Sequence, residues 1–296
     1  MGNTNRPYIV SADIYLLLQK WASQKGFTLP PLDFFTELRK KMVVKLEEMF
    51  GLVDFVTEED LQEGLSYFFQ RNSLPVVSLD RIYVEAEFNL ELTRAVDISG
   101  KDVGLKNRAG TPNLEYQLDL IKAGLAQTAA PAKIVLVDDV IFSGDMLMEV
   151  IEMLEKEGME VAGVFAGIGV AEGVDKIKDK NIPVTCVYEY MEVIDEICER
   201  DFYPGVPLSG RLIANSSNIG SPYILPFGRP GKWASIPEEY QVEFSKFCWK
   251  QTSELFLAIE EYSGKKVFCY DLGRLIIDFP VNGTRYIKAI ESVQVK

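Results

Sequence analysis

Segments with the pattern of buried strands alternate with amphipathic helical segments in the middle of the chain, and this alternation restricts the fold most strongly. The apolar runs KIVLV (133–137) and VAGVFAGIGV (161–170) are typical of strands. Between them, apolar residues recur at helical spacing over 147–154. Strands that alternate with helices form an open, mostly parallel sheet with helices on both faces. We therefore predict an α/β fold.

Other segments flank this predicted core on both sides. Residues 1–50 contain two amphipathic helical patterns. Residues 201–233 are rich in Gly, Pro and Ser, and a long helical pattern follows them. We expect an N-terminal helical segment at 1–50, a core at 51–200 and a C-terminal α+β extension at 201–296.

Charge and composition exclude several classes of function. The net charge of −13 argues against nucleic acid or an anionic membrane as the main partner. The chain has no histidine, which excludes Ser-His-Asp triads and His-based zinc sites. We expect no secretion signal, because the first residues lack a basic start followed by a long apolar run. No apolar run reaches the ~18 residues that would span a bilayer. The four cysteines form no Cys-x-x-Cys pair, so we expect a cytoplasmic protein with free thiols.

The stretch VLVDDVIFSGDML (135–147) combines features of a sugar-phosphate site. Ligands of parallel sheets bind at the carboxyl ends of the strands, where Asp138 and Asp139 stand. Two carboxylates can accept hydrogen bonds from vicinal ribose hydroxyls. The helix that follows Ser143 and Gly144 begins with unpaired backbone N–H groups, which attract a phosphate. These features favour a ribose 5-phosphate ligand.

The same stretch resembles the phosphoribosyl pyrophosphate (PRPP) signature of the type I phosphoribosyltransferases. The variant found in the pyrimidine-operon regulator with uracil phosphoribosyltransferase activity also has an aromatic residue at the position of Phe142. The resemblance implies that Asp138 and Asp139 bind the ribose hydroxyls. It also implies that a turn holds the 5-phosphate, formed by Phe142, Ser143, Gly144, Asp145 and Met146. It further implies Mg²⁺ bound with PRPP or pyrophosphate, a small-molecule partner (PRPP or a nucleotide) and a homodimer. Acids after an apolar strand also occur in receiver domains, but there they usually follow the first strand.

A second part of the resemblance concerns the leaving group. In the family, a strand that ends in Arg precedes a flexible loop that closes over the pyrophosphate. The segment LELTR is followed by a Gly-rich, cationic stretch, 97–113, that reads as a mobile loop. The catalytic candidates implied by the resemblance are Arg94, Lys101, Lys106 and Arg108. Charged loop residues are also commonly just solvated, so both interpretations stay open.

Several features depart from the family pattern. Met146 replaces the Thr that usually closes the turn, and Asp145 puts a carboxylate beside the expected phosphate. Such a charge is repulsive unless a cation intervenes or the side chain points away, although an acid in the first helical turn is also ordinary capping. The pyrophosphate-binding loop has two candidate positions, 57–60 after the strand-like run LVDFV and 78–81 after PVVSL.

A hood that recognises the base is expected outside the core, either from the N-terminal helices or, as we favour, from 201–233. The candidates for contact with a planar base are Tyr223, Phe227, Arg229 and Trp233. The alternative is that these aromatic residues pin a long segment to its own core. Two functions follow from the sequence. One is a Mg-dependent phosphoribosyltransferase that acts in nucleotide metabolism. The other is a sensor that binds PRPP or a nucleotide without turnover.

Overall fold

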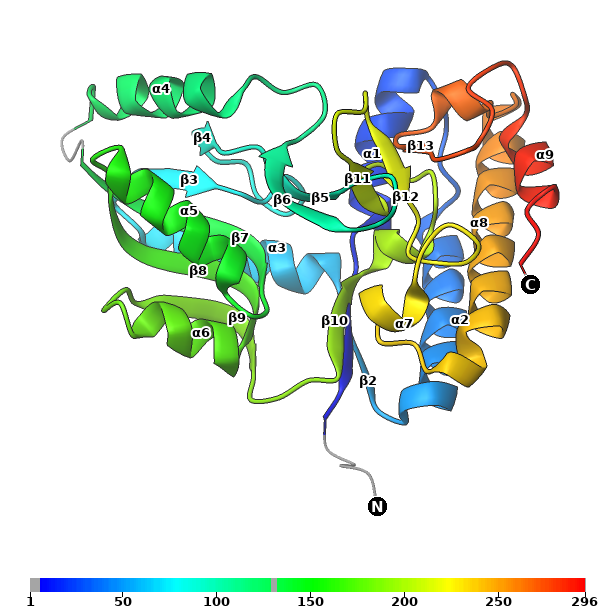
Figure 1. Ribbon diagram of the computed structural model, residues 1–296, viewed down its shortest axis with the longest axis horizontal. Coiled ribbons are helices and arrows are strands. Elements are labelled where there is room, and N and C mark those ends of the chain that lie inside the picture. Colours follow the sequence, from blue (N-terminus) through cyan, green and yellow to red (C-terminus); the bar gives the residue numbers. More distant parts are fainter. Residues whose placement is uncertain (1–5, 129–131, 296) are drawn as a thin grey trace. The chain divides into compact units, whose positions relative to one another are not determined.

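The computed structural model describes residues 6–128 and 132–295 (Figure 1). The chain divides into two compact units, which are described separately. Unit 1 comprises Met1–Val56, Arg94–Gly104 and Ile194–Lys296, and unit 2 comprises Thr57–Thr93 and Leu105–Val193. This division places the segments 1–50 and 201–296, which we expected to be separate, in one unit.

Unit 2 contains a five-stranded sheet in the order β4-β3-β7-β8-β9. Every pair of neighbouring strands in it is parallel. Its elements are α3 (Glu58–Arg71), β3 (Val76–Ser78), β4 (Phe88–Asn89), α4 (Leu114–Leu125), β7 (Lys133–Ile141), α5 (Asp145–Lys156), β8 (Glu160–Val170), α6 (Ala171–Lys178) and β9 (Val184–Tyr190). The predicted α/β class with a parallel sheet flanked by helices is confirmed.

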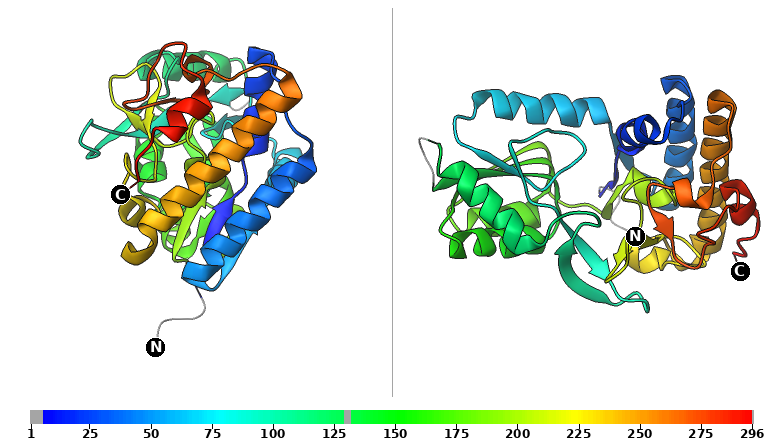
Figure 2. Two further views of the ribbon diagram at one scale, coloured as in Figure 1. Left: turned by 90° about the vertical axis from the view of Figure 1, so that its right-hand side faces the viewer. Right: turned by 90° about the horizontal axis from the view of Figure 1, so that it is seen from above.

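Helices cover both faces of this sheet. In the right-hand view of Figure 2, the light-blue helix α3 lies on one side and the green helices α5 and α6 lie on the other. Phe68 of α3 packs against Phe165 of β8 at a ring-centroid distance of 5.3 Å. On the opposite face, apolar residues of α4, α5 and α6 share one buried cluster with Ile134 and Leu136 of β7. Burial of these apolar faces is the main driving force for this packing.

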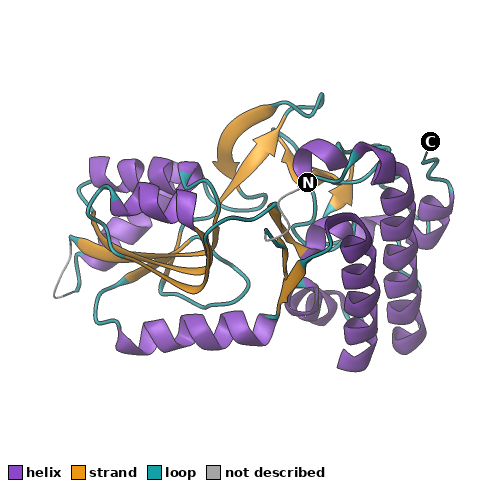
Figure 3. Cartoon of the chain, turned by 90° about the horizontal axis from the view of Figure 1, so that it is seen from below, coloured by secondary structure: helices purple, strands orange, loops and turns teal. Residues whose placement is uncertain are grey.

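Unit 1 has a three-stranded parallel sheet, β10-β1-β2, and parts of a second sheet, β13-β12-β11-β5-β6. Its strands are β1 (Tyr8–Ser11), β2 (Val53–Val56), β10 (Asp195–Cys198), β11 (Arg211–Ile213), β12 (Ile219–Ser221) and β13 (Leu275–Ile276). Strands β5 (Leu92–Val96) and β6 (Asp102–Asn107) cross the boundary between the units. Its α-helices are α1 (Ile14–Lys25), α2 (Leu32–Phe50), α7 (Pro230–Trp233), α8 (Gln241–Ser263) and α9 (Tyr286–Glu291). Figure 3 shows the helices and strands in different colours. Within the described ranges, no helix is long and apolar enough to cross a membrane.

Two sequence expectations are wrong in part. The strand LVDFV is formed as β2, but it pairs with β1 of unit 1 and is not part of the five-stranded sheet. Thr57 after it caps helix α3, because its side chain accepts a hydrogen bond from the N–H of Asp60 at 3.2 Å. The expected mobile loop 97–113 also contains strand β6, and the turn before this strand is closed by a hydrogen bond from Asp97 N to Lys101 O at 2.8 Å.

Candidate functional site

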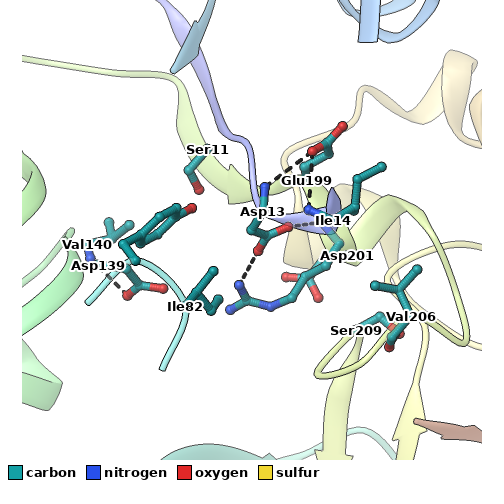
Figure 4. Close-up of polar contacts among 12 residues, drawn as sticks. Ser11, Asp13, Ile14, Ile82, Asp139, Val140, Glu199, Asp201, Val206 and Ser209 are labelled. Atoms are coloured by element: carbon teal, nitrogen blue, oxygen red, sulfur yellow. Dashed lines mark hydrogen bonds and ion pairs between the residues drawn. The ribbon is translucent and has the colours of Figure 1, made fainter. Parts of the chain in front are cut away.

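The two adjacent acids lie within β7 rather than after its end, because the strand continues to Ile141. Asp138 is only 3% exposed, whereas Asp139 is half-buried. Each carboxylate accepts a hydrogen bond from the next backbone N–H. Asp138 accepts one from Asp139 N at 3.0 Å. Asp139 accepts one from Val140 N at 2.9 Å, which Figure 4 shows. Among the described residues, Asp138 Oδ2 is buried and has no hydrogen-bond partner. A buried carboxylate oxygen without a donor is costly, so this atom is a candidate to receive a ligand hydroxyl or a cation.

Burial and neighbouring charge act together on this atom. Burial raises the pKa of Asp138 well above its usual range, and the charge of Asp139 raises it further. Asp80, from the loop after β3, adds to the same effect. A ligand that donates hydrogen bonds or brings a cation would therefore be favoured by this group of carboxylates.

The turn after β7 depends on two glycines. Gly144 has a φ of 74° and is the N-cap of α5, and a Cβ there would lie 2.9 Å from the carbonyl oxygen of Gly173 in α6. A Cβ on Gly173 would lie 2.3 Å from the carbonyl oxygen of Phe142. These contacts are too short for any side chain, so α6 supports the turn through direct backbone contact. The N-terminus of α5 is thereby fixed at the end of β7.

The unusual acid of the turn is paired with a cation. Lys176 Nζ of α6 lies 2.6 Å from Asp145 Oδ1 and donates to the carbonyl of Ser143 at 3.1 Å. The hydroxyl of Ser143 donates to the other oxygen of Asp145 at 2.9 Å. The charge of Asp145 is therefore compensated, and a cation stands beside the turn that we expected to hold a phosphate.

The loop after β3 is organised around a buried acid. Asp80 is 2% exposed and accepts hydrogen bonds from the N–H groups of Ile82, Tyr83 and Val84 at 2.8, 2.8 and 3.0 Å. Burial raises the pKa of Asp80 to about 6, and the charge of Asp139 contributes to this shift. Because β3 and β7 are parallel neighbours, with Ser78 opposite Val137, this loop lies at the same sheet edge as Asp138. Of the two predicted loop positions, only 78–81 follows a strand of this sheet.

The loop cation Arg108 is held close to the loop after β3. Its Nη2 donates to the carbonyl of Leu79 at 3.0 Å, and its Nε lies 3.5 Å from the carboxylate of Glu91. Arg81 contacts the same carboxylate at 3.1 Å. Arg108 thus ties the β3 loop to the end of the β5–β6 hairpin, which is a structural contact in addition to any role with a ligand.

The other predicted cations differ in location. Arg94 and Lys101 belong to unit 1, whereas Lys106 belongs to unit 2. All three side chains are exposed on the strands β5 and β6 or on the turn between them. Their catalytic roles stay predictions.

The predicted hood residues contact other parts of unit 1. Tyr223 and Trp233 form an edge-to-face pair at 5.6 Å, and the guanidinium of Arg211 lies 5.4 Å and 5.0 Å from their rings. Arg229 donates to the carbonyl of Ser99 at 3.1 Å. Phe227 packs against Trp249, with ring centroids 6.1 Å apart. These contacts stabilise unit 1 itself, and their role in base recognition stays a prediction.

Unit 1 has its own group of buried acids, part of which Figure 4 shows. Asp13 is paired with Arg200, and Glu199 accepts hydrogen bonds from Arg39 and from Asp13 N. Asp201 accepts one from Gly210 N at 2.8 Å. Burial raises the pKa of Asp13 to about 8. Each acid has a partner within the unit, which is typical of a structural network.

The carboxylates of unit 2 suit a metal ion only together with a ligand. No three His, Cys, Asp or Glu side chains in the described part of the chain are arranged to hold a metal ion. Mg²⁺ in proteins is commonly bound by one or two carboxylates together with substrate phosphates and waters. The open oxygen of Asp138 and the neighbouring Asp139 fit that pattern.

Comparisons with known proteins give weak similarity to phosphoribosyltransferases. No protein-family model and no curated protein matches the sequence. The match with orotate phosphoribosyltransferase from Aeropyrum pernix covers 45% of this chain and 68% of that protein's chain, with 16% identity and a TM-score of 0.24. The match with adenine phosphoribosyltransferase from Rhodothermus marinus covers 44% of this chain and 77% of that protein's chain, with 18% identity and a TM-score of 0.25. The match with orotate phosphoribosyltransferase from Mycobacterium tuberculosis H37Rv covers 44% of this chain and 68% of that protein's chain, with 11% identity and a TM-score of 0.26. Similarities this low support neither a ligand nor an activity.

Two residues of the site were missed in the sequence, and the role of a third was not predicted. Lys176 and Gly173 meet the turn only through the packing of α6, about thirty positions further along the chain. The sequence placed Asp80 in a candidate loop but gave no sign that its carboxylate would bind three backbone N–H groups. The only local signal for such a turn is the Asp itself, because Asp side chains commonly accept a hydrogen bond from the backbone N–H two residues further along the chain.

Replacement of Gly173 by Ala tests the support of the turn. The new Cβ would collide with the backbone at Phe142 and Gly144, so we expect a loss of about 1–3 kcal/mol in the free energy of unfolding. The neighbouring exposed residue supplies the control, Glu172→Ala, which should change stability by no more than about 0.5 kcal/mol. Urea denaturation measures both. Equal stability of Gly173→Ala and wild type would contradict the close contact.

The buried acids also predict a dependence of stability on pH. The folded-state pKa values of Asp80 and Asp138 are raised, so the folded protein binds more protons than the unfolded chain. Their contribution to the free energy of unfolding is complete below the pKa of the unfolded chain. It is lost as the pH rises through the folded-state pKa, which is about 6 for Asp80 and is also raised for Asp138. Asp138→Asn removes one of these groups, so its free energy of unfolding should fall less than that of wild type between about pH 4 and pH 8. Asp119→Asn, at an exposed site on α4, controls for the removal of one charge. Parallel curves for wild type and Asp138→Asn would contradict the assignment.

Proposed function

We propose that unit 2 binds a ribose 5-phosphate ligand, either PRPP or a nucleotide, at the carboxyl edge of its parallel sheet. Asp138 and Asp139 accept the ribose hydroxyls, and the turn 142–146 receives the 5-phosphate. The observation that carries this proposal is the buried Oδ2 of Asp138, which has no donor among the residues described. It lies one short turn before the N-terminus of α5, where backbone N–H groups favour a phosphate.

Charge supports the same assignment. A sugar hydroxyl that donates to Asp138 would satisfy the open oxygen without adding a negative charge to the acids around it. The phosphate would bind near Lys176 rather than near the carboxylates of β7. The site therefore offers acceptors to hydroxyls and, at the turn, backbone N–H groups beside a lysine that also pairs with Asp145.

In its catalytic form, the proposal is phosphoribosyl transfer. The bond between C1 of PRPP and pyrophosphate breaks, a bond from C1 to a nitrogen nucleophile forms, and the nitrogen proton passes to solvent. Mg²⁺ bound with the ligand would neutralise the leaving pyrophosphate. The residues of β7 would hold the ribose, and exposed Lys106 is the candidate in unit 2 for contact with the leaving group. Positioning and charge compensation would provide most of the catalysis.

Binding without turnover is the second candidate, and the contacts of Arg108 favour it. Its guanidinium is engaged with the Leu79 carbonyl and with Glu91, so it already has partners within the unit. A pyrophosphate-release assay with PRPP, Mg²⁺ and a panel of purine and pyrimidine bases separates the two forms. Release that depends on a base supports the transferase, and tight binding without release supports the sensor.

Asp138→Asn and Asp139→Asn test the ribose site. Hydrogen bonds to charged groups contribute about 1.5–3 kcal/mol, so each change should weaken binding of ribose 5-phosphate about tenfold to a hundredfold. Isothermal titration calorimetry with and without Mg²⁺ measures the affinity, and Asp119→Asn is the control. Unchanged affinity in both variants would rule out this position for the sugar.

Lys176→Met tests the place of the phosphate. Loss of the cation should weaken ribose 5-phosphate binding by about tenfold, because an ion pair with a dianion is removed. Lys178→Met is a matched control on the same helix, where the side chain lies 3.7 Å from Glu189. Stability should change by less than about 1 kcal/mol in either variant, since both pairs are partly exposed. An equal effect of the two changes on affinity would place the phosphate elsewhere.

A further inference from the structure

The loop after β3 already contains the anion that its backbone is arranged to bind. Consecutive N–H groups of Ile82, Tyr83 and Val84 converge on the two oxygens of Asp80 at 2.8, 2.8 and 3.0 Å. Converging backbone N–H groups of this kind form nests that bind phosphates and other anions in many proteins. In this chain the bound anion is the side chain of Asp80.

This nest lies at the sheet edge where the proposed ligand binds. Leu79 N donates to Val137 O at 2.8 Å, directly before Asp138 in the neighbouring strand. The charge of Asp139 acts on Asp80, and the charge of Asp80 acts on Asp138. A ligand held by Asp138 would therefore have the Asp80 loop as its immediate neighbour.

The carboxylate of Asp80 is fixed in place. Its side chain is 2% exposed, and its own carbonyl accepts a hydrogen bond from Ser78 Oγ at 3.0 Å. The preceding carbonyl, that of Leu79, is held by Arg108 at 3.0 Å. A ligand phosphate could take the three N–H groups only if this buried side chain left them.

We propose that Asp80 is a built-in anion that fills this nest, and that it makes the site select ribose 5-phosphate monoesters over ligands that also carry pyrophosphate. The inference rests on the proposed ribose 5-phosphate site and specifies its ligand class. A single 5-phosphate would lie at the turn beside Lys176. A pyrophosphate on the ribose would instead meet Asp80 and Asp139, whose like charges oppose it.

The acids alone would not define a site, but a second observation points to a ligand there. The open Oδ2 of Asp138 is buried, and no donor reaches it from the described residues. A hydroxyl can pair with this carboxyl in either protonation state, whereas a phosphate oxygen pairs only with the protonated form. The edge therefore favours the sugar part of a ligand and disfavours a second anionic group.

Two variants separate the charge of Asp80 from its occupation of the nest. Asp80→Gly removes both and exposes the three N–H groups, and Asp80→Asn removes the charge but keeps one acceptor oxygen. Asn72→Gly is the control, because Asn72 makes a similar local turn, with Leu74 N at 3.2 Å, at the opposite end of β3. Calorimetry at about pH 8, above the pKa of Asp80, uses inorganic pyrophosphate, PRPP and ribose 5-phosphate, each with and without Mg²⁺. Thermal melting tests whether each variant is folded.

Wild type should bind ribose 5-phosphate more tightly than PRPP. Asp80→Gly should bind pyrophosphate and PRPP about tenfold more tightly than wild type, with a smaller gain for Asp80→Asn. Ribose 5-phosphate affinity should change less than about threefold in either variant. If the variants are folded and neither gains pyrophosphate affinity, the inference is overturned even if ribose 5-phosphate binds. If pyrophosphate affinity rises but no protein binds ribose 5-phosphate, the nest is confirmed and the proposed function fails.

Discussion

The candidate site depends on the parallel pairing of β7 with β3 on one side and with β8 on the other. This pairing brings the carboxyl ends of the strands to one edge, so residues about sixty positions apart become neighbours there. Asp80 lies in the loop that follows β3, and Asp138 lies in the neighbouring strand β7. The buried apolar residues of β7, such as Ile134 and Leu136, fix the strand against α4, α5 and α6. Without this packing, water would solvate the carboxylates, and a ligand would gain little free energy by hydrogen-bonding to them.

Burial of several carboxylates at one edge is unfavourable, and the chain offsets it in different ways. Asp80 receives three backbone N–H groups, and Asp145 receives the ammonium of Lys176. Asp138 receives one N–H for its two oxygens. The position with the least compensation is therefore the one where a ligand would contribute most. Strained or unsatisfied groups of this kind are common at functional sites.

The sequence predicted the helices, the strands and the acids of the central motif, because apolar periodicity and turn residues are local signals. It predicted that 97–113 is a mobile loop, but β6 forms there. The pairing of β6 with β5 was missed because it has no strong local pattern in the sequence. It treated LVDFV as part of the core sheet, but pairing with β1 depends on tertiary context. It also gave Asp145 no partner, because Lys176 reaches the turn only after α6 has packed. Local chemistry was thus predictable, and the compensation of charges across elements was not.

A crystal structure of the protein soaked with ribose 5-phosphate tests the central claim most directly. The account predicts the ribose hydroxyls within hydrogen-bond distance of Asp138 and Asp139, and the phosphate at the N-terminus of α5 beside Lys176, with Asp80 still bound to its own loop. A ligand bound elsewhere on the chain, or a phosphate in the loop after β3 with Asp80 displaced, would contradict it.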